Sequence, residues 1–344
     1  MEFKSQSNQQ WIYVSRPEGR VSADNYRLDT CAIEDDLSQN EVLVEMQYIS
    51  VDPYMRIEQA ATDTFSPSYP LGTLQMGTTV GVIRKSANEK FNVGDNVVGY
   101  LGWRRFARCH GNDVKPISMV GDVPLTAYMG VLGMPGRTAW FGLMDAGKPR
   151  PGEVLVVSAA AGAVGSLVVQ FGKKAGCTVV GIQGGAEKCA FVKNELKADY
   201  VVDYKKFNSP ALLGAEISRQ VAGPVDVYFD NVGGWITDTI IPMINLRARI
   251  IICGQISQYN GGLDAPSMEP RFLQHMLYKR ATIQGILARD YVHRMDEMLS
   301  IVTPWVANGD ILYKETEVLG FERLPEALGM LFDGVNTGKM VVKV

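Results

Sequence analysis

A turn rich in glycine and alanine lies near the middle of the sequence, between an apolar run and a helical pattern. The run at residues 154–157 leads into Ser158-Ala159-Ala160-Ala161-Gly162-Ala163-Val164-Gly165, and the helical pattern continues to Gln170. Small residues at this spacing let the backbone approach a phosphate, and the first amide N–H groups of the helix face its negative charge. The pattern has the AxxGxxG form of a dinucleotide-binding turn and predicts that Gly162, Ala163, Val164 and Gly165 bind a pyrophosphate. A turn that serves only tight helix packing is the alternative, which the flanking strand and helix patterns disfavour.

The residues after the next apolar run indicate which dinucleotide the turn would bind. That run ends at Ile182 and is followed by Gln183-Gly184-Gly185-Ala186-Glu187-Lys188. Enzymes that use NAD place a carboxylate at this strand end, where it accepts a hydrogen bond from the ribose. Here glycines leave room for a 2′-phosphate, and Lys188 follows one helical turn later. Glu187 instead favours NAD, and a single lysine on a helix is often only solvated. The spacing therefore favours NADP, with NAD as the alternative.

Residues that could bind a metal ion or hydrolyse a substrate are not found at the required spacing. The three histidines and five cysteines are scattered along the chain, whereas zinc sites need clustered Cys, His or carboxylate ligands. Cys109 and His110 are adjacent, but no further ligand accompanies them, so we interpret this pair as structural. The chain also has no GxSxG nucleophile motif. The sequence therefore predicts hydride transfer without a metal ion.

Short apolar runs rich in β-branched residues supply the strands that would position this turn. They lie at residues 154–157, 179–182, 200–202, 225–229, 250–252 and 282–285. Helical patterns lie between them, notably at residues 162–175, 186–195 and 235–245. Strands buried on both faces that alternate with helices are typical of a parallel sheet built from βαβ units. We therefore predict an α/β fold with a doubly wound Rossmann sheet.

The chain before and after this region has a different pattern. Residues 41–46 alternate between polar and apolar, glycines punctuate residues 78–83, and a Gly94-Asp95 turn precedes Val97, which together predict a β-rich domain. Later in the chain, residues 324–331 are amphipathic and residues 338–342 resemble a final strand. We predict that this tail returns to the first domain. The predicted domains are residues 1–134 with 303–344, which are β-rich, and residues 135–302, which bind the dinucleotide.

Composition excludes several classes of protein. The chain has 344 residues, 46% of them hydrophobic, a net charge of −3 and a pI near 5.8. Lysine and arginine occur in runs of at most two, so the sequence predicts no binding to nucleic acid or to an anionic membrane. The polar first ten residues and the lack of a long apolar span predict a cytoplasmic protein without a membrane segment. The odd number of dispersed cysteines predicts free thiols.

Several further motifs resemble one known family in content and in order. They are SVDPYMR at residues 50–56, GVLGMPG at 130–136, the turn described above, FDNVGG at 229–234, CGQISQYN at 253–260 and NTGK at 336–339. This family is the zinc-independent part of the medium-chain dehydrogenase/reductase superfamily that includes prostaglandin and leukotriene reductases, plant alkenal double-bond reductases and bacterial NADPH-dependent curcumin/dihydrocurcumin reductases. Residues 11–17 and 184–189 make the likeness greatest to the bacterial curcumin reductases. The resemblance covers nearly the whole chain.

The resemblance implies a fold, a reaction, a cofactor and an assembly. It implies a β-rich GroES-like catalytic domain beside the Rossmann domain, and NADPH-dependent reduction of the C=C bond of curcumin-like enones or alkenals. It also implies a homodimer, in which the predicted edge strand at residues 282–285 could pair with its counterpart. The implied cofactor contacts are Lys188 and Tyr204 at the 2′-phosphate, Asn231, Cys253, Gly254, Ile256, Ser257 and Tyr259 along the ribose and nicotinamide, and Asn336 at the nicotinamide.

Two tyrosines are the candidate catalytic residues. When a hydride reaches the β-carbon of an enone, charge develops on the carbonyl oxygen and needs a hydrogen-bond donor in a site with little water. Tyr259 follows the fifth strand of the predicted sheet, where such sheets place ligands, and the resemblance implies that it stabilises the enolate. A ring that only covers the cofactor is the alternative. Tyr54 is predicted to contact the substrate, with core packing as the alternative, and the α-carbon could receive its proton from Tyr259 or from water.

Substrate identity is the least determined property. Residues 286–291 lie where relatives differ, and residues 259–271 have a sequence of their own, so both segments are predicted to border the substrate. An NADPH-dependent quinone reductase shares the fold, the cofactor and the lack of zinc, and only the family motifs argue against it. A protein that binds NADP without turnover is the alternative from another class, disfavoured by Tyr259 beside an intact turn.

Overall fold

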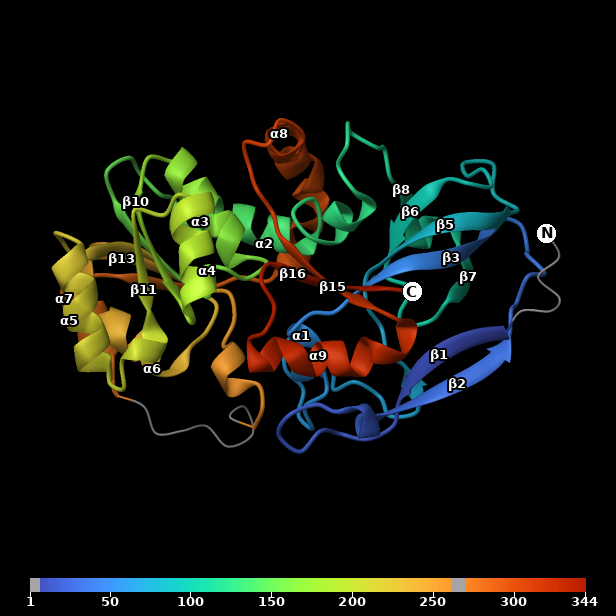
Figure 1. Cartoon of the computed structure of the whole chain (residues 1–344), viewed down its shortest axis with the longest axis horizontal. Helices are drawn as coiled ribbons and strands as arrows, with labels where there is room; N and C mark the ends of the chain where they lie inside the picture. Colours follow the sequence, from blue (N-terminus) through green and yellow to red (C-terminus); the bar gives the residue numbers. More distant parts are fainter. Residues whose placement is uncertain (1–6, 262–269) are drawn as a thin grey trace. The chain divides into compact units, whose positions relative to one another are not determined.

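The computed structural model describes residues 7–261 and 270–344, and the chain divides into two compact units (Figure 1). The first comprises Met1–Met129, Glu315–Asn336 and Met340–Val344, and the second comprises Gly130–Lys314 and Thr337–Lys339. The sequence predicted that the chain enters the second domain after residue 134 and returns to the first after residue 302. The return lies later in the structure, after Lys314, because helix α8 (Met295–Ala307) runs through the predicted boundary and belongs to the second unit.

The second unit contains a parallel sheet of six strands in the order β11-β10-β9-β12-β13-β14. Its strands are β9 (Val154–Ser158), β10 (Thr178–Gln183), β11 (Tyr200–Asp203), β12 (Val225–Asp230), β13 (Ile244–Ile252) and β14 (Thr282–Gly285). All five residues of β9 are buried, as a central strand covered on both faces requires. The predicted Rossmann sheet is confirmed.

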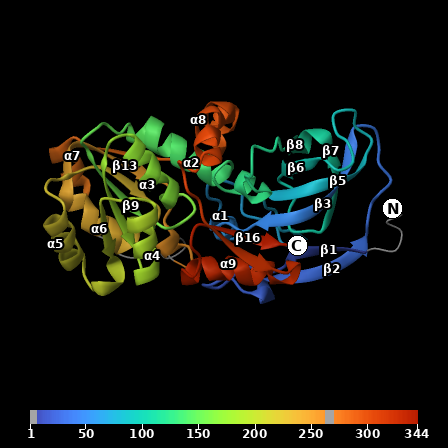
Figure 2. The same cartoon turned by 45° about the horizontal axis from the view of Figure 1, so that its top comes forward.

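Helices cover both faces of this sheet (Figure 2). They are α2 (Met134–Phe141), α3 (Gly165–Lys174), α4 (Ala186–Ala190), α5 (Pro210–Gln220), α6 (Gly234–Ile240) and α7 (Leu273–Lys279), while α8 packs against α2. On one face, Val156 of β9 belongs to a core cluster with Leu213 of α5 and Ile236 of α6. On the other face, a Cβ atom at Gly172 of α3 would lie 2.3 Å from the side chain of Leu155. Alternate residues of one strand therefore anchor helices on opposite faces.

Helix ends differ from the sequence prediction in two places. The helix predicted at residues 235–245 ends at Ile240, because Pro242 follows in a short 3-10 turn and β13 begins at Ile244. Proline lacks the amide hydrogen that a continuing helix requires. The helix predicted at residues 186–195 is α4 followed by a π-helical segment, Phe191–Glu195. Its hydrogen-bond pattern cannot be read from the apolar spacing.

The first unit is β-rich, as predicted. One sheet has the order β15-β16-β3-β5-β6-β8, with β7 also paired to β3, and a smaller sheet has the order β2-β1-β4. The elements are β1 (Ser7–Tyr13), β2 (Tyr26–Ala32), β3 (Glu41–Ser50), α1 (Tyr54–Glu58), β4 (Thr73–Leu74), β5 (Thr79–Ser86), β6 (Asn96–Gly99), β7 (Phe106–His110), β8 (Val114–Pro116), β15 (Glu315–Leu319), α9 (Leu324–Asp333) and β16 (Lys339–Lys343). Strand β16 pairs antiparallel with β3, with Val341 opposite Ser50. The tail therefore returns to the first unit as predicted.

Membrane-spanning helices were searched for in the two described ranges. None of the helices there is both long enough and apolar enough to cross a bilayer.

One edge of the second unit's sheet carries exposed apolar side chains. Strand β14 is paired to β13 on one side only, and all four of its residues are exposed. Helix α7, which leads into β14, exposes Leu273, Leu277 and Tyr278 to between 71% and 73%. An unpaired strand beside apolar side chains is a surface that another chain can cover. We propose that the other chain is a second copy of this protein.

Light scattering tests this homodimer. We expect the wild-type protein to have about twice the mass of one 37.8 kDa chain at micromolar concentration. Leu277→Lys should shift the mass toward that of one chain, because the charge would have to be buried in the contact. Leu212→Lys on α5, where the side chain is 54% exposed, is the matched control and should leave the mass unchanged. A wild-type mass of one chain would contradict the proposal.

Candidate functional site

The glycine-rich turn joins the end of β9 to the start of α3. Ala159 has a positive φ of 48°, and a Cβ atom at Gly165 would lie 2.2 Å from the carbonyl oxygen of Ala159. Glycine is therefore required at residue 165 for the backbone to close this turn. The N-cap residue of α3 is Val164, which makes no side-chain cap. The amides of Ser166, Leu167 and Val168 already donate to the carbonyls of Gly162 and Val164. The amides that could face an anion are therefore those of Ala163, Val164 and Gly165, at the entry to α3.

Two other segments hold the turn in place. The amide N–H of Ala161 donates to Oε1 of Gln183 at 2.9 Å, and the carbonyl of Ala161 accepts from the amide of Gly338 at 2.7 Å. A Cβ atom at Gly338 would lie 1.8 Å from the carbonyl oxygen of Lys314, so this close approach also requires glycine. Asn336, a predicted cofactor contact, lies two residues before Gly338 in the chain and belongs to the first unit.

The end of β10 and the residues after β11 form a compact, positively charged corner. Gly185 has a positive φ of 93°, and a Cβ atom at Gly184 would lie 2.8 Å from the ring of Tyr204. Oδ1 of Asp203 accepts from the amides of Gly185 at 3.1 Å and Lys205 at 3.2 Å. These bonds fold the Tyr204–Lys206 turn back onto the two glycines.

Two lysines meet at this corner. The pKa of Lys188 is lowered, first by partial burial of its ammonium group and then by the nearby positive charge of Lys205. Two neighbouring positive charges favour an anion beside them, which fits the predicted 2′-phosphate. Lys188 and Tyr204 were predicted from the sequence, whereas Lys205 was not. The Lys205-Lys206 pair directly after Tyr204 was the available signal.

The carboxylate of Asp230 organises the end of β12. It is buried and accepts five hydrogen bonds, from the hydroxyls of Ser158, Tyr228 and Thr237 and from the amides of Val232 and Gly233. Asn231 donates from its amide to Oγ of Ser158 at 2.8 Å and from Nδ2 to the carbonyl of Ser158 at 2.7 Å. Asn231, a predicted cofactor contact, is therefore fixed across the end of β9.

The segment Cys253 to Tyr259 is fastened to the same place. The amides of Cys253 and Gly254 donate to the carbonyl of Asp230 at 2.8 and 3.1 Å. Oγ of Ser257 donates to the carbonyl of Val232 at 2.7 Å. Burial raises the pKa of the Cys253 thiol to about 12, so this thiol stays protonated at neutral pH. The structure thus brings the predicted contacts Asn231 and Cys253 to Tyr259 together at the ends of β12 and β13.

Tyr259 has a buried hydroxyl with a defined partner. The side chain is 7% exposed, and its oxygen accepts from the amide of Gln255 at 2.9 Å. A Cβ atom at Gly254 would lie 2.8 Å from this oxygen. Burial raises the pKa of Tyr259 to about 12, and the Gln255 amide lowers it in part. The phenol is therefore protonated at neutral pH and can donate its hydrogen while its oxygen accepts.

Tyr54 lies in the first unit, at the start of α1. Burial raises the pKa of its hydroxyl well above the ordinary value. Arg56 on the same helix donates to the carbonyls of Gly19 at 3.2 Å and Pro17 at 3.4 Å, which gives it a structural role. Tyr54 and Tyr259 thus belong to different units.

The described residues of the two segments predicted to border the substrate lie in the second unit. Residues 288–294 form a 3-10 segment in which the Tyr291 ring stacks on Phe141, with centroids 4.7 Å apart. Arg294 covers the same Phe141 ring at 4.6 Å and pairs with Asp145. This segment is therefore held against α2 and the π-helical residues that follow it. Residues 262–269 of the predicted segment 259–271 lie outside the described residues.

Metal ligation was examined over residues 7–261 and 270–344. No group of three or more His, Cys, Asp and Glu side chains in these ranges could hold a metal ion. At the Cys109-His110 pair, burial raises the thiol pKa to about 11. Nδ1 of His110 accepts from the amide of Asn112 at 3.1 Å, so the histidine caps the next turn.

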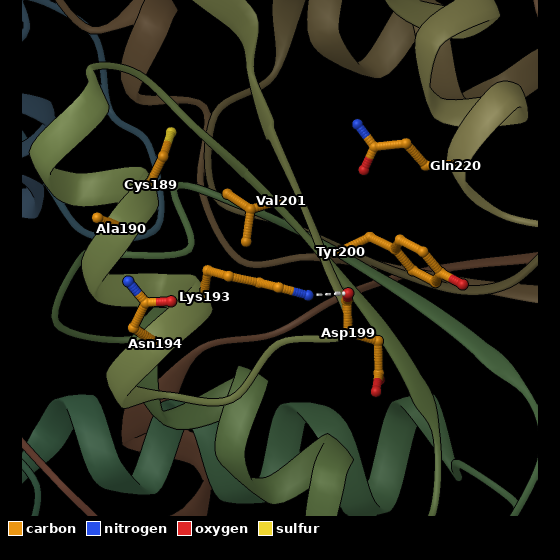
Figure 3. Close-up of a pocket in the computed structure, with 8 residues that line it drawn as sticks. All are labelled: Cys189, Ala190, Lys193, Asn194, Asp199, Tyr200, Val201 and Gln220. Atoms are coloured by element: carbon orange, nitrogen blue, oxygen red, sulfur yellow. Dashed lines mark hydrogen bonds between the residues drawn. The ribbon is translucent and has the colours of Figure 1, made fainter.

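A hollow of about 330 Å³ lies beside the edge strand β11 (Figure 3). It is lined by Cys189, Ala190, Lys193, Asn194, Asp199, Tyr200, Val201 and Gln220. Nζ of Lys193 donates to the carbonyl of Asp199 at 2.5 Å. None of the predicted site residues lines this hollow, so it does not belong to the candidate site.

Comparison with known proteins places the chain in a family. The family model described as "N-terminal domain of oxidoreductase" matches residues 9–117, and the one described as "Zinc-binding dehydrogenase" matches residues 163–303. The described residues do not form the metal site that the second description implies.

Relatives match over most or all of the chain. The NADPH-dependent curcumin reductase of Escherichia coli (strain K12) is 37% identical, covering 100% of this chain and 99% of the relative. The 2-alkenal reductase (NADP(+)-dependent) of Nicotiana tabacum is 38% identical, covering 89% of this chain and 88% of the relative. The crystal structure of CurA from Vibrio vulnificus in complex with NADPH has a TM-score of 0.88 at 37% identity, covering 98% of this chain and 99% of that one. This chain therefore belongs to the medium-chain dehydrogenase/reductase superfamily of oxidoreductases.

Proposed function

We propose that this protein uses NADPH to reduce the carbon–carbon double bond of α,β-unsaturated carbonyl compounds, without a bound zinc ion. The observation that carries the proposal is Tyr259, a buried and protonated phenol whose oxygen accepts from the Gln255 amide at the end of the sheet. Such a group can stabilise an enolate. Two relatives of similar length, named for curcumin reduction and for 2-alkenal reduction, support the choice of reaction.

The second unit has residues that fit NADPH in three places. The amides of Ala163, Val164 and Gly165, at the entry to α3, would bind the pyrophosphate. Tyr204 and Lys205, whose side chains lie beside Gly184, would bind the 2′-phosphate together with Lys188, which is close enough to Lys205 for its pKa to be lowered by that charge. Asn231 and the segment from Cys253 to Tyr259 would line the ribose and nicotinamide. When bound, NADPH supplies the hydride that the β-carbon of the substrate receives.

The chain's own residues then act on the rest of the substrate. Tyr259 donates its hydroxyl hydrogen to the carbonyl oxygen on which negative charge develops. The Gln255 amide holds the phenol oxygen and polarises its O–H bond, so the donor is oriented before the reaction begins. Gly254 leaves the space that this oxygen occupies. We also propose that the Tyr54 side chain contacts the substrate.

Following NADPH absorbance tests the reaction class. We expect rapid oxidation of NADPH with a simple enone and little without any acceptor. A quinone should be reduced more slowly than the enone, because the proposed site donates one hydrogen bond to a single carbonyl oxygen. Faster quinone reduction would make the protein a quinone reductase. No oxidation with either acceptor would make it an NADP-binding protein without turnover.

Substitutions of the two lysines test the cofactor assignment. Lys188→Ala and Lys205→Ala should each raise the KM for NADPH about tenfold or more, since a hydrogen bond to a charged group contributes about 1.5 to 3 kcal/mol. The KM for NADH, which has no 2′-phosphate, should change little. Lys193→Ala is the control, because Lys193 instead contacts the carbonyl of Asp199. Equal effects on both cofactors would remove the lysines from the phosphate site.

Tyr259→Phe tests the role of the phenol. The ring remains, so NADPH affinity measured by direct titration should persist, while turnover of a simple enone should fall by about 10²–10³, or about 2.7 to 4 kcal/mol. Tyr200→Phe is the control, because Tyr200 lines the hollow beside β11 outside the candidate site, and it should behave like wild type. A loss of only a few-fold would make the ribose hydroxyl the main donor to the oxygen. Unchanged turnover would exclude Tyr259 from the mechanism, and a collapse in NADPH affinity would make it a cofactor ligand.

A further inference from the structure

Arg137 on α2 carries a positive charge that the fold does not neutralise. Its side chain is half-buried, and its Nε atom is enclosed without a hydrogen-bond partner. Nη1 donates to Sδ of Met295 at 3.8 Å, and a thioether sulfur is a weak, uncharged acceptor. Within residues 7–261 and 270–344, no Asp or Glu side chain pairs with this guanidinium. A charge withdrawn from water without a partner destabilises a protein, so the group needs an explanation outside the fold itself.

Two acidic groups near this face of α2 are committed to another arginine. Phe141 lies four residues after Arg137 and so shares its face of the helix. The guanidinium of Arg294 covers the Phe141 ring at 4.6 Å and pairs with both Asp145 and Glu297. One arginine at this face therefore has two carboxylate partners, whereas Arg137 has a sulfur atom.

Helix α2 places Arg137 toward the carboxyl ends of the parallel strands. A Cβ atom at Gly142 would lie 2.8 Å from the ring of Phe229, and one at Gly147 would lie 3.4 Å from the side chain of Val227. The helical chain therefore runs opposite to β12, and Arg137, which precedes Gly142 by five residues, lies beyond Phe229. At a rise of about 1.5 Å per residue, this offset along the helix is about 7 Å. Open α/β sheets bind their ligands at this end.

We propose that Arg137 binds a carboxylate carried by the enone substrate at a distance from its double bond. The inference rests on the proposed function, because it names the class of enone that the same site reduces. The two oxygens of a carboxylate accept together from Nε and Nη of one guanidinium. Such a ligand gives Nε its missing partner and neutralises the charge, which Met295 cannot do. Arg137 is thus a specificity-determining residue and takes no part in hydride or proton transfer.

A charged ligand also fits the position of the other site residues. Asn231 and the segment from Cys253 to Tyr259 lie at the ends of β12 and β13, the same end of the sheet as Arg137. One elongated substrate can therefore place its carbonyl oxygen at Tyr259 and its carboxylate at Arg137. The length of the chain between the two groups then decides which acids are good substrates.

Paired substrates test this inference. The probes are enones with an unbranched chain from the β-carbon to a terminal carboxylate, in a series of chain lengths, and each acid is compared with its methyl ester. With NADPH, wild type should reduce at least one acid with a kcat/KM about tenfold or more above that of its ester. Arg137→Met, which keeps an apolar side chain against Met295, should lose this preference while kcat/KM for the ester changes little. Arg137→Lys should keep part of the preference, because it retains the charge without the bidentate geometry.

Arg219→Met is the matched control, since Arg219 pairs with Glu216 on α5 of the same unit and should keep the acid preference of wild type. Thermal unfolding gives a second readout. Arg137→Met should unfold a few degrees above wild type, because it removes a half-buried charge that has no partner in the fold. A lower unfolding temperature would show that the guanidinium stabilises the fold and would overturn the proposal.

The kinetic outcomes separate this inference from the reaction on which it rests. If wild type reduces the esters but prefers none of the acids, the carboxylate site is wrong while the proposed function stands. If Arg137→Met keeps the acid preference and instead loses affinity for NADPH, the guanidinium binds the cofactor and the proposal is again wrong. If neither acids nor esters are reduced, the proposed function and the carboxylate site both fail.

Discussion

The buried carboxylate of Asp230 is the interaction on which the candidate cofactor site depends. An ionised carboxylate without partners is strongly disfavoured in a protein interior, and the five hydrogen bonds that Asp230 accepts offset this cost. Its donors come from β9, β12, α6 and the turn between the last two. The same residue's carbonyl holds the start of the segment that ends at Tyr259. One side chain therefore fixes the relative positions of strand ends that lie far apart in the sequence.

The sheet and the glycine-rich turn could be predicted because their determinants are local. Six β-branched runs became six strands, and the spacing of Gly162 and Gly165 follows from backbone contacts within the turn itself. The end of α6 could also have been placed, since Pro242 is visible in the sequence. The π-helical segment after α4 could not, because its hydrogen-bond pattern depends on how the helix packs rather than on apolar spacing.

Residues whose role depends on contacts between distant segments were missed. Lys205 matters because Asp203 bonds the turn that carries it to Gly185, and that bond is not encoded in local spacing. The family resemblance supplied Asn231 and Tyr259 as site residues, but not the reason for their positions. That reason is the set of bonds to Ser158, Asp230 and Gln255.

The order of segments along the chain constrains how the protein folds during synthesis. Strand β16 lies inside the larger sheet of the first unit, between β15 and β3, yet it is made after the whole second unit. Until β16 leaves the ribosome, the edge of β3 that it covers remains unpaired, and such edges are prone to wrong association. Gly338, just before β16, also bonds to the glycine-rich turn of the second unit. The unit that is begun first is therefore completed last, so the open edge of β3 persists through the synthesis of the second unit.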